Sequence, residues 1–463
     1  MRKSLLPLIL ALGLTACSVP VAPPRPSATP VATASPTAPA VQRPPVIPNF
    51  PSQGAIPTPD PNAVLLEKRL AMGAPALAPG AAVPASAADS ATTKPAKPGL
   101  ILPAPVPNEP GTLTAGLWSD LNNWSFWQDL LAQPEWAAMP GLWGIHTLQR
   151  VQVKVEGPDG PLADVPVELR EQEQLIFQAR THAGGVAELF INPLQAVEKP
   201  DLSTQQVKAS RYQIRVQTGR ETLTRDFEPA AANALTTLSL KATTQPEPLV
   251  QADLMLVVDT TGSMGDELEY LKTELKNVSA QILAQSRPDL SLRLSANFYR
   301  DRGDEYIVRP FPFSSSSDQV SQQLAAQSAN GGGDFPEAVD YALQDAIEEH
   351  AWSPTARARL LFLVLDAPPH QEAQTLNRLR TSLLRAAARG IRIIPVASSG
   401  VDKETEFLLR MLAIVTGGRY LFLTDDSGVG ESHLKPTIGP FSVEKLNALM
   451  VRTARAYIAG DLP

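Results

Sequence analysis

The sequence predicts an α/β fold with a doubly wound, mostly parallel sheet in the C-terminal half of the chain. Apolar runs alternate there with helical patterns, as in sheets whose parallel strands are joined by helices. Two further observations predict the rest of the chain. Short segments of alternating apolar and polar residues over 148–242 favour a smaller all-β sandwich. About half of the 45 prolines fall between Pro20 and Pro110, which favours a disordered Pro-rich N-terminal tether.

Residues 1–16 have the pattern of a lipoprotein signal peptide. Two cations precede an apolar stretch of about a dozen residues, which is too short to span a bilayer. The chain's one cysteine, Cys17, ends the sequence LTAC, which resembles a bacterial lipobox. The resemblance implies lipidation of Cys17 and stable membrane anchoring. A plain signal peptide with an incidental cysteine is the alternative.

The residue after Cys17 bears on which membrane would hold the anchor. It is Ser18, and not the aspartate that tends to retain such lipoproteins in the inner membrane. We therefore expect the cell envelope, with the outer membrane or the cell surface favoured. Residues 17–112 would form the disordered Pro/Ala-rich tether, which could extend on the order of 200 Å at its limit.

Residues 113–147 form a Trp-rich segment that is expected to be helical. Asp120 is placed to cap a helix with Trp124, Trp127 and Leu131 on one side. Such a cluster either offers an aromatic platform for a ligand or packs the helix onto its own domain, and packing is favoured.

Residues 148–246 alternate as the strands of a small β-sandwich do. In the first strand Val151, Val153 and Val155 share one face, and the turn sequences GPDGP and HAGG separate later strands. The order of strands and turns resembles carboxypeptidase-regulatory-like and transthyretin-like domains.

Residues 247–463 carry the α/β pattern. Runs such as LMLVV and RLLFLVL are typical of strands buried on both faces. The expected strands are 254–258, 359–365, 391–397 and 417–424, with 305–313 as an antiparallel edge strand, and the expected helices are 265–285, 317–329, 335–352, 373–389, 402–416 and 442–458.

Acidic residues follow the strands of this sheet at the edge where α/β proteins bind ligands. Asp259 and Asp366 end two apolar runs, and Asp334 lies in a Gly-rich loop before a helix. Thr261 and Ser263 place hydroxyls beside Asp259. Carboxylates gathered this way are costly without a cation, and an oxygen-only ligand set favours Mg²⁺, or Ca²⁺ or Mn²⁺. Helix capping is the alternative role, above all for Asp334.

The sequence Asp259-Thr-Thr261-Gly-Ser263 resembles the Asp-x-Ser/Thr-x-Ser motif of von Willebrand factor type A (VWA) domains. That family has a Rossmann-like fold and a metal-ion-dependent adhesion site (MIDAS). The resemblance implies that Thr261, Ser263 and Asp366 bind the metal, with Asp259 acting directly or through water. The chain departs from the family at the middle loop, which reads GGGDFPEAV and lacks the usual threonine, and Asp334 is expected to replace it.

Loops 300–306, 331–337 and 366–372 would form a rim around this site and determine which partner binds. The alternative for these charges is a solvated, salt-bridged loop. The tripeptide at 302–304 also matches the Arg-Gly-Asp integrin ligand, which is a weaker interpretation. The candidate rim residues are Arg300, Arg302, Asp304, Glu337 and His370.

Several function classes are disfavoured. The formal net charge of −7 offers no broad nucleic-acid footprint. The chain has no phosphate-binding loop and no G-x-S-x-G elbow. His370 with Asp366 and a serine is therefore a poor candidate for a catalytic triad.

The sequence thus favours a non-enzymatic, membrane-anchored protein-binding module of adhesion type, whose metal contacts a protein partner. A structural role in an envelope complex, with the metal stabilising the fold, is the first alternative. A metal-dependent envelope hydrolase is the weakest.

Overall fold

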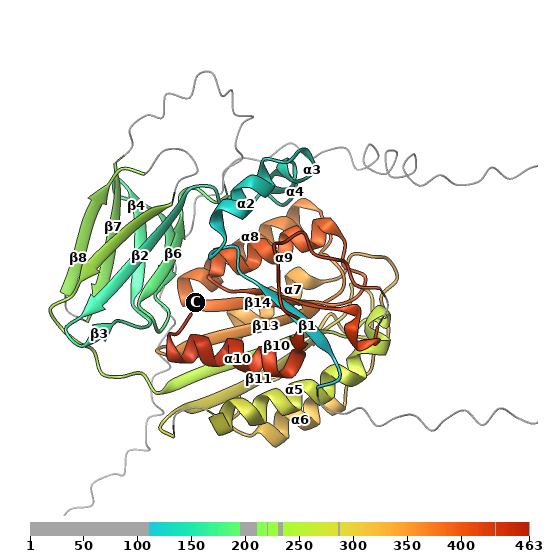
Figure 1. Cartoon of the computed structure of the whole chain (residues 1–463). Coiled ribbons are helices and arrows are strands. Elements are labelled where there is room, and N and C mark those ends of the chain that lie inside the picture. Colours follow the sequence, from blue (N-terminus) through green and yellow to red (C-terminus); the bar gives the residue numbers. More distant parts are fainter. Residues whose placement is uncertain are drawn as a thin grey trace, which may run out of the picture. The chain divides into compact units, whose positions relative to one another are not determined.

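The computed structural model describes residues 111–194, 211–219, 221–229, 235–285, 288–430 and 432–462 (Figure 1). Cys17, the signal peptide and the tether up to residue 110 lie outside the described residues, so those expectations stay predictions. No helix within the described ranges is long and apolar enough to cross a membrane.

An eight-stranded mixed sheet forms the centre of the α/β part, and the predicted α/β class is confirmed. Its five inner strands run parallel, and the outer ones pair antiparallel. In spatial order the strands are β12 (Val308–Pro310), β11 (Ser291–Tyr299), β10 (Gln251–Asp259), β13 (Ala358–Leu365), β14 (Ile391–Ala397), β15 (Tyr420–Leu423), β1 (Thr114–Trp118) and β16 (Glu444–Lys445).

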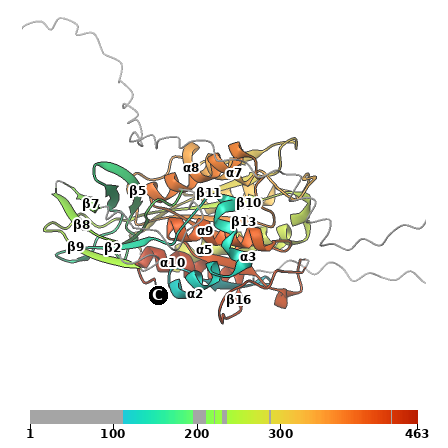
Figure 2. The same ribbon diagram turned by 90° about the horizontal axis from the view of Figure 1, so that it is seen from above.

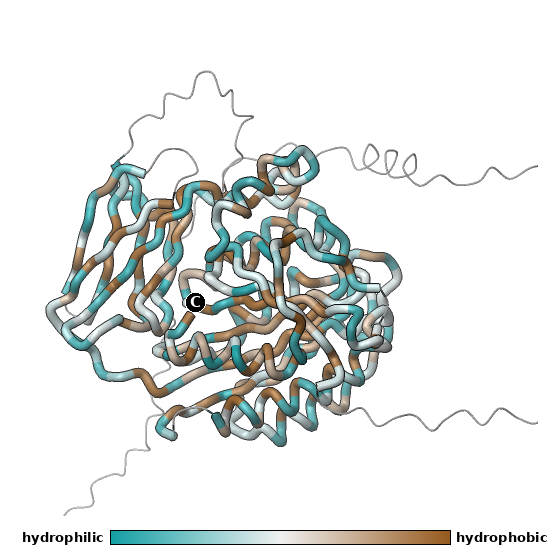
Figure 3. Tube along the Cα trace, in the orientation of Figure 1, coloured by the Kyte–Doolittle hydropathy of each residue, from teal (hydrophilic) through white to brown (hydrophobic). Residues whose placement is uncertain are grey.

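Helices cover both faces of this sheet, which explains why its central strands are apolar along most of their length (Figures 1 and 3). On one face, Leu254, Leu256 and Val258 of β10 join a core with leucines of α5. Met255 and Val257 point to the opposite face and are equally buried. The covering helices are α5 (Gly265–Gln285), α6 (Ser317–Ala325) and α10 (Leu446–Ala459) on one side and α7 (Val339–Gln344), α8 (Ala373–Arg389) and α9 (Lys403–Thr416) on the other.

One predicted helix is wrong at both ends. The pattern predicts a helix over 335–352, whereas α7 begins at Val339 and passes into a π-helical turn at Asp345–Glu349. Pro336 disfavours helical backbone in the residue before it. The lead-in segment instead forms a bridge between Glu337 and Pro369.

The Trp-rich segment contributes a strand that the sequence pattern did not reveal. β1 lies between β15 and β16, and Glu274 of α5 accepts backbone N–H bonds from Gly111, Thr112 and Leu113. The short helices α2 (Trp124–Leu131), α3 (Pro134–Ala137) and α4 (Met139–Trp143) follow. Figure 2 shows α2 and α3 together in the view from above.

Packing explains the tryptophans of this segment, because all five are buried: Trp118, Trp124, Trp127, Trp136 and Trp143. Trp127 stacks on Phe407 of α9 with ring centroids 5.5 Å apart. The expectation that Asp120 caps α2 is wrong. The N-cap position is Asn123, and the Asp120 carboxylate binds the buried Arg410 instead.

Residues 150–241 form two four-stranded sheets. The buried valines of β2 lie on one strand face, and Phe177 and Phe190 bring one strand of each sheet into edge-to-face contact. One sheet contains β2 (Arg150–Gly157), β3 (Gly160–Pro161), β6 (Val186–Phe190) and β9 (Thr236–Lys241), and the other β4 (Pro166–Glu171), β5 (Gln174–Arg180), β7 (Tyr212–Thr218) and β8 (Glu221–Phe227).

Candidate functional site at the carboxyl edge of the sheet

Asp259 and Asp366 meet at the carboxyl edge of two neighbouring strands. β10 ends at Asp259, β13 ends one residue before Asp366, and the two strands pair in parallel with Val258 opposite Val364. Both carboxylates are buried. The sequence-based placement of this pair thus agrees with the structure.

Asp259 organises the turn that follows its strand. Its Oδ1 accepts hydrogen bonds from the Thr261 backbone N–H at 2.8 Å and from Thr261 Oγ1 at 2.6 Å. Thr261 Oγ1 in turn lies 3.3 Å from Ser263 Oγ. Thr261 occupies the cap position of the short 3₁₀ turn Gly262–Met264 but makes no side-chain cap bond. The hydroxyls therefore face the carboxylate and do not serve as caps.

Glu337, and not Asp334, supplies the third carboxylate. Glu337 is 3% exposed, and its backbone N–H donates to the Pro368 carbonyl at 2.8 Å. Asp334 is exposed in a bend of the same loop. The predicted metal-binding role of Asp334 is therefore not supported by its position, and the predicted rim position of Glu337 is wrong. No local pattern separates the two acids, because Glu337 is held in place by its bridge to Pro369.

Three buried carboxylate oxygens of this cluster make no hydrogen bond of ordinary geometry: Asp259 Oδ2, Asp366 Oδ1 and Glu337 Oε2. The Tyr299 hydroxyl is close enough to Asp259 to lower the pKa of that carboxyl group, but not enough to offset its burial. Unpartnered buried carboxylates are costly. All donors of the cluster are oxygens, a set that suits a hard divalent cation. In the described part of the chain, no three His, Cys, Asp or Glu side chains converge closely enough to hold a metal alone. A cation would therefore also need the hydroxyls of Thr261 and Ser263, or water.

Burial and mutual repulsion raise the pKa of all three carboxyl groups. Burial raises the pKa of Asp259 to about 6, and the charge of Asp301 adds to this. Burial and then the charge of Asp259 raise the pKa of Asp366 to about 7. Glu337 reaches a pKa of about 9 through burial and then the charges of Asp259 and Asp301. Without a positive charge, the cluster thus favours bound protons.

A fourth acidic residue, Glu267, lies near Asp366, and the sequence analysis did not identify it as part of the site. It is fully buried in α5 and its charge also raises the pKa of Asp366. Its Oε1 accepts the Ser399 backbone N–H and lies 3.0 Å from His433 Nε2, while Oε2 has no partner. His433 also contacts Asp425. Through His433, Glu267 therefore helps to hold the loop that follows β15.

Most predicted rim residues hold the loops together. Arg300 is 4% exposed and donates to the carbonyls of Thr260 and Ser328, so its predicted place on the rim surface is wrong. Asp304 accepts the backbone N–H groups of Asp301 and Gly332. The loops therefore surround the acidic site in a fixed arrangement.

Arg302 is the one exposed member of the predicted rim. It pairs with Glu372 across the loops at 2.9 Å. Because Asp304 binds backbone groups within the loops, the Arg-Gly-Asp tripeptide is not an open peptide ligand. His370 Nε2 contacts Asp301 Oδ1 at 2.8 Å, which leaves the triad with Asp366 without support. Phe335 is 45% exposed beside the site and adds an apolar contact surface.

Comparison with known proteins places residues 253–432 under the family model of the von Willebrand factor type A domain. An ariadne-like RING finger protein of Acanthamoeba polyphaga mimivirus is 28% identical over 187 residues, which are 37% of this chain and 18% of that protein. The chain thus matches less than a fifth of that relative's length.

Two solved structures match part of the chain at low TM-scores. One is the conserved hypothetical protein BatB from Bacteroides thetaiotaomicron, with a TM-score of 0.32, 11% identity, and coverage of 44% of this chain and 98% of that one. The other is proximal thread matrix protein 1 from the mussel byssus, with a TM-score of 0.28, 16% identity, and coverage of 36% and 40%.

Proposed function

We propose that residues 253–432, a von Willebrand factor type A domain, bind a protein partner through a divalent cation held at the carboxyl edge of the sheet. Domains of this family generally mediate protein–protein interactions. The observation that carries the proposal is the set of three buried carboxylate oxygens without partners beside two hydroxyls.

Asp259, Thr261, Ser263 and Asp366 would hold the cation, with Mg²⁺ the first candidate and Ca²⁺ or Mn²⁺ the others. Glu337 would neutralise part of its charge. A bound cation supplies a Lewis-acidic position that an acidic side chain of a partner can complete. The neighbouring surface, with exposed Phe335 and the Arg302–Glu372 pair, would contribute contacts that choose the partner.

The same proposal includes a membrane anchor. Lipidation of Cys17 and a Pro-rich tether would present the β-sheet domain and the VWA domain in the cell envelope of a bacterium. A permanent structural role in an envelope complex is the second candidate, favoured by the hydrogen bonds that join the loops around the site. Neither candidate requires catalysis.

Cation binding is expected to strengthen as the pH rises. The cation-free carboxyl groups have pKa values of about 6, 7 and 9, so protons compete with the cation over that range. Calorimetric titration with Mn²⁺ at pH 6, 7.5 and 9 should give a falling dissociation constant and proton release on binding. An affinity independent of pH would contradict this assignment of the ligands.

In contrast to the cation affinity, the stability of the cation-free chain should decrease as the pH rises. Because these folded-state pKa values are raised, the folded chain holds protons that the unfolded chain releases near pH 4. The contribution of the site to stability in EDTA therefore falls as the pH rises.

Affinity capture with the full chain tests the partner function. We expect a protein to be retained from envelope extract in Mg²⁺ and lost in EDTA. Asp259→Asn should lose it too, whereas Asp334→Asn, a matched change in an exposed neighbour, should keep it. Retention of the same proteins under every condition would contradict cation-dependent binding and support the permanent structural role.

A further inference from the structure

The opposite edge of the central sheet carries a row of buried arginines. Arg359 and Arg392 lie at the amino ends of β13 and β14, and Arg419 directly precedes β15. The exposed fractions of the three residues are 4%, 4% and 5%. Since these strands are parallel neighbours, the guanidinium groups gather at one edge, away from the acidic site.

Two carboxylates near this row are already bound. Asp164, before β4, accepts two hydrogen bonds from Arg359 at 2.7 and 2.9 Å and one from Arg180 at 2.6 Å. Glu188 of β6 accepts two from Arg150 at 2.8 and 2.9 Å. Both carboxylates therefore have arginine partners other than Arg392.

Arg392 has no such ion pair within the described ranges. Its Nη1 donates to the Thr416 carbonyl at 2.7 Å, and its Nη2 donates to the Arg180 carbonyl. Burial lowers the pKa of Arg392, although the ionisable groups of Tyr457, Glu188 and Asp164 oppose this. A buried guanidinium bound only to carbonyls is an unusually favourable position for an added anion.

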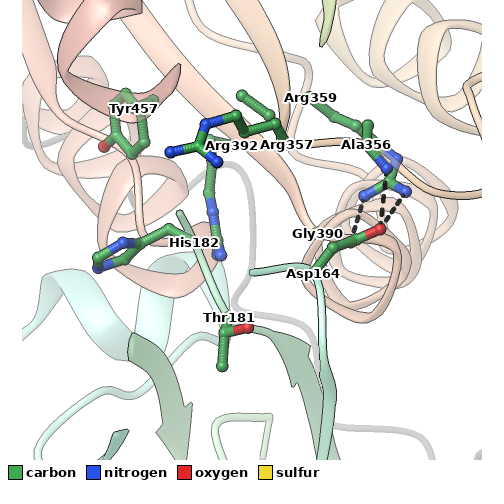
Figure 4. A pocket seen from close by; sticks show the side chains of 10 residues that line it. Asp164, Thr181, His182, Ala356, Arg357, Arg359, Gly390, Arg392 and Tyr457 are labelled. Atoms are coloured by element: carbon green, nitrogen blue, oxygen red, sulfur yellow. Dashed lines mark hydrogen bonds and ion pairs between the residues drawn. The ribbon is translucent and has the colours of Figure 1, made fainter. Parts of the chain in front are cut away.

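A cavity of about 290 Å³ adjoins this arginine. A smaller hollow, shown in Figure 4, shares His182, Arg392 and Tyr457 with it. In the figure these three side chains come from separate parts of the chain and lie around the same space, and the Asp164–Arg359 pair lies away from them. The larger cavity is also lined by Arg419, by the polar Gln152 and by Glu188, whose carboxylate already accepts hydrogen bonds from Arg150 and Gln152. Its volume is at the low end for ligand pockets, so it suits a small molecule.

The lowered pKa of His182 indicates a positive electrostatic potential in this cavity. Burial and then the charges of Arg392 and Arg419 lower its pKa to about 3. The imidazole is therefore neutral at pH 7 and can accept or donate a hydrogen bond without adding charge. Its Nδ1 already accepts the Gly184 backbone N–H, which leaves Nε2 as the nitrogen available to a ligand.

We propose that this cavity binds a small anion, with a carboxylate or phosphate group placed between Arg392, Arg419 and His182. The site is separate from the cation site, since it lies at the other edge of the sheet. It joins residues of the β-sheet domain to the VWA domain, so the anion would also strengthen the contact between them.

Calorimetry and thermal unfolding of the full chain in EDTA test this proposal, with inorganic phosphate and succinate as separate probes. We expect saturable binding of at least one probe and a higher melting temperature in its presence. The probe that binds more tightly shows whether the site prefers a phosphate or a carboxylate group. If neither millimolar phosphate nor succinate binds or shifts the melting temperature, the proposal is wrong.

Two variants and one control locate the binding. Arg392→Gln should weaken binding by about 10- to 100-fold, since it removes a charged hydrogen-bond donor. Val186→Glu should have a similar effect, because it adds a competing carboxylate to the cavity lining. It leaves the buried arginines intact, so it tests the proposal even if Arg392→Gln does not fold.

Arg452→Gln removes the same charge from an exposed position of α10 and should bind the anion as the unmodified chain does. Asp259→Asn should also bind it normally, which separates this proposal from the cation site. Unchanged anion binding in folded Val186→Glu would overturn it.

Discussion

Replacing Asp120 with alanine is expected to lower the free energy of unfolding by about 3 kcal/mol, the low end for breaking a buried ion pair, because the buried Arg410 then keeps only Glu406 as its acidic partner. The Asp120 carboxylate accepts hydrogen bonds from Arg410 Nε at 2.9 Å and Nη2 at 2.6 Å. Arg410 is fully buried in α9, and its guanidinium lies over the rings of Trp127 and Trp136. Denaturant unfolding of the full chain measures the loss.

The matched control is Glu135→Ala, which breaks an ion pair between the same two parts of the chain. Glu135 pairs with Lys403 of α9 at 3.2 Å, with side chains 56% and 49% exposed. Exposed pairs contribute about 0–1 kcal/mol, so this change should have little effect. If the two variants were equally stable, the buried network would not hold the Trp-rich segment to the VWA domain.

Glu337→Gln is expected to weaken Mg²⁺ binding by about 10- to 100-fold, the usual range for a group that supports a metal site. This prediction rests on the proposed cation. Glutamine preserves the shape of the side chain and resembles the protonated acid, which the raised pKa of about 9 favours without a cation. The variant should therefore fold normally in EDTA. Calorimetric titration with Mg²⁺ measures the affinity.

Asp334→Asn is the control for Glu337→Gln, as it removes one carboxylate from the same loop. Its side chain is exposed, and water screens its charge, so the Mg²⁺ affinity should stay nearly unchanged. A larger loss from Asp334→Asn than from Glu337→Gln would restore the role that the sequence pattern assigned to Asp334.

Local patterns in the sequence were enough to predict four of the five parallel strands and half of the acidic site, whereas β11 was not among the expected strands. Strands buried on both faces leave long apolar runs, and polar residues at their ends gather at one edge by the geometry of the sheet. Asp259 and Asp366 therefore followed from their positions alone. The antiparallel edge strand was also predicted correctly, although β12 is shorter than the segment 305–313.

Features that depend on contacts between distant residues could not be predicted this way. β1 joins the sheet because Thr114–Trp118 pairs with a strand some 300 residues later in the chain. The charge of Arg300 suggests an exposed position, yet its guanidinium group is buried and donates hydrogen bonds to backbone carbonyls of Thr260 and Ser328. Glu337 and Asp334 differ in burial because of the bridge to Pro369, which no local pattern encodes.

The most direct test of the central claim is thermal unfolding of the full chain and of Asp259→Asn, each in EDTA and in millimolar Mg²⁺. A cation present at about 100 times its dissociation constant stabilises the folded chain by about 2.7 kcal/mol. We expect a higher melting temperature with Mg²⁺ for the unmodified chain and no change for Asp259→Asn. Equal shifts in both proteins, or none in either, would contradict a cation site at Asp259.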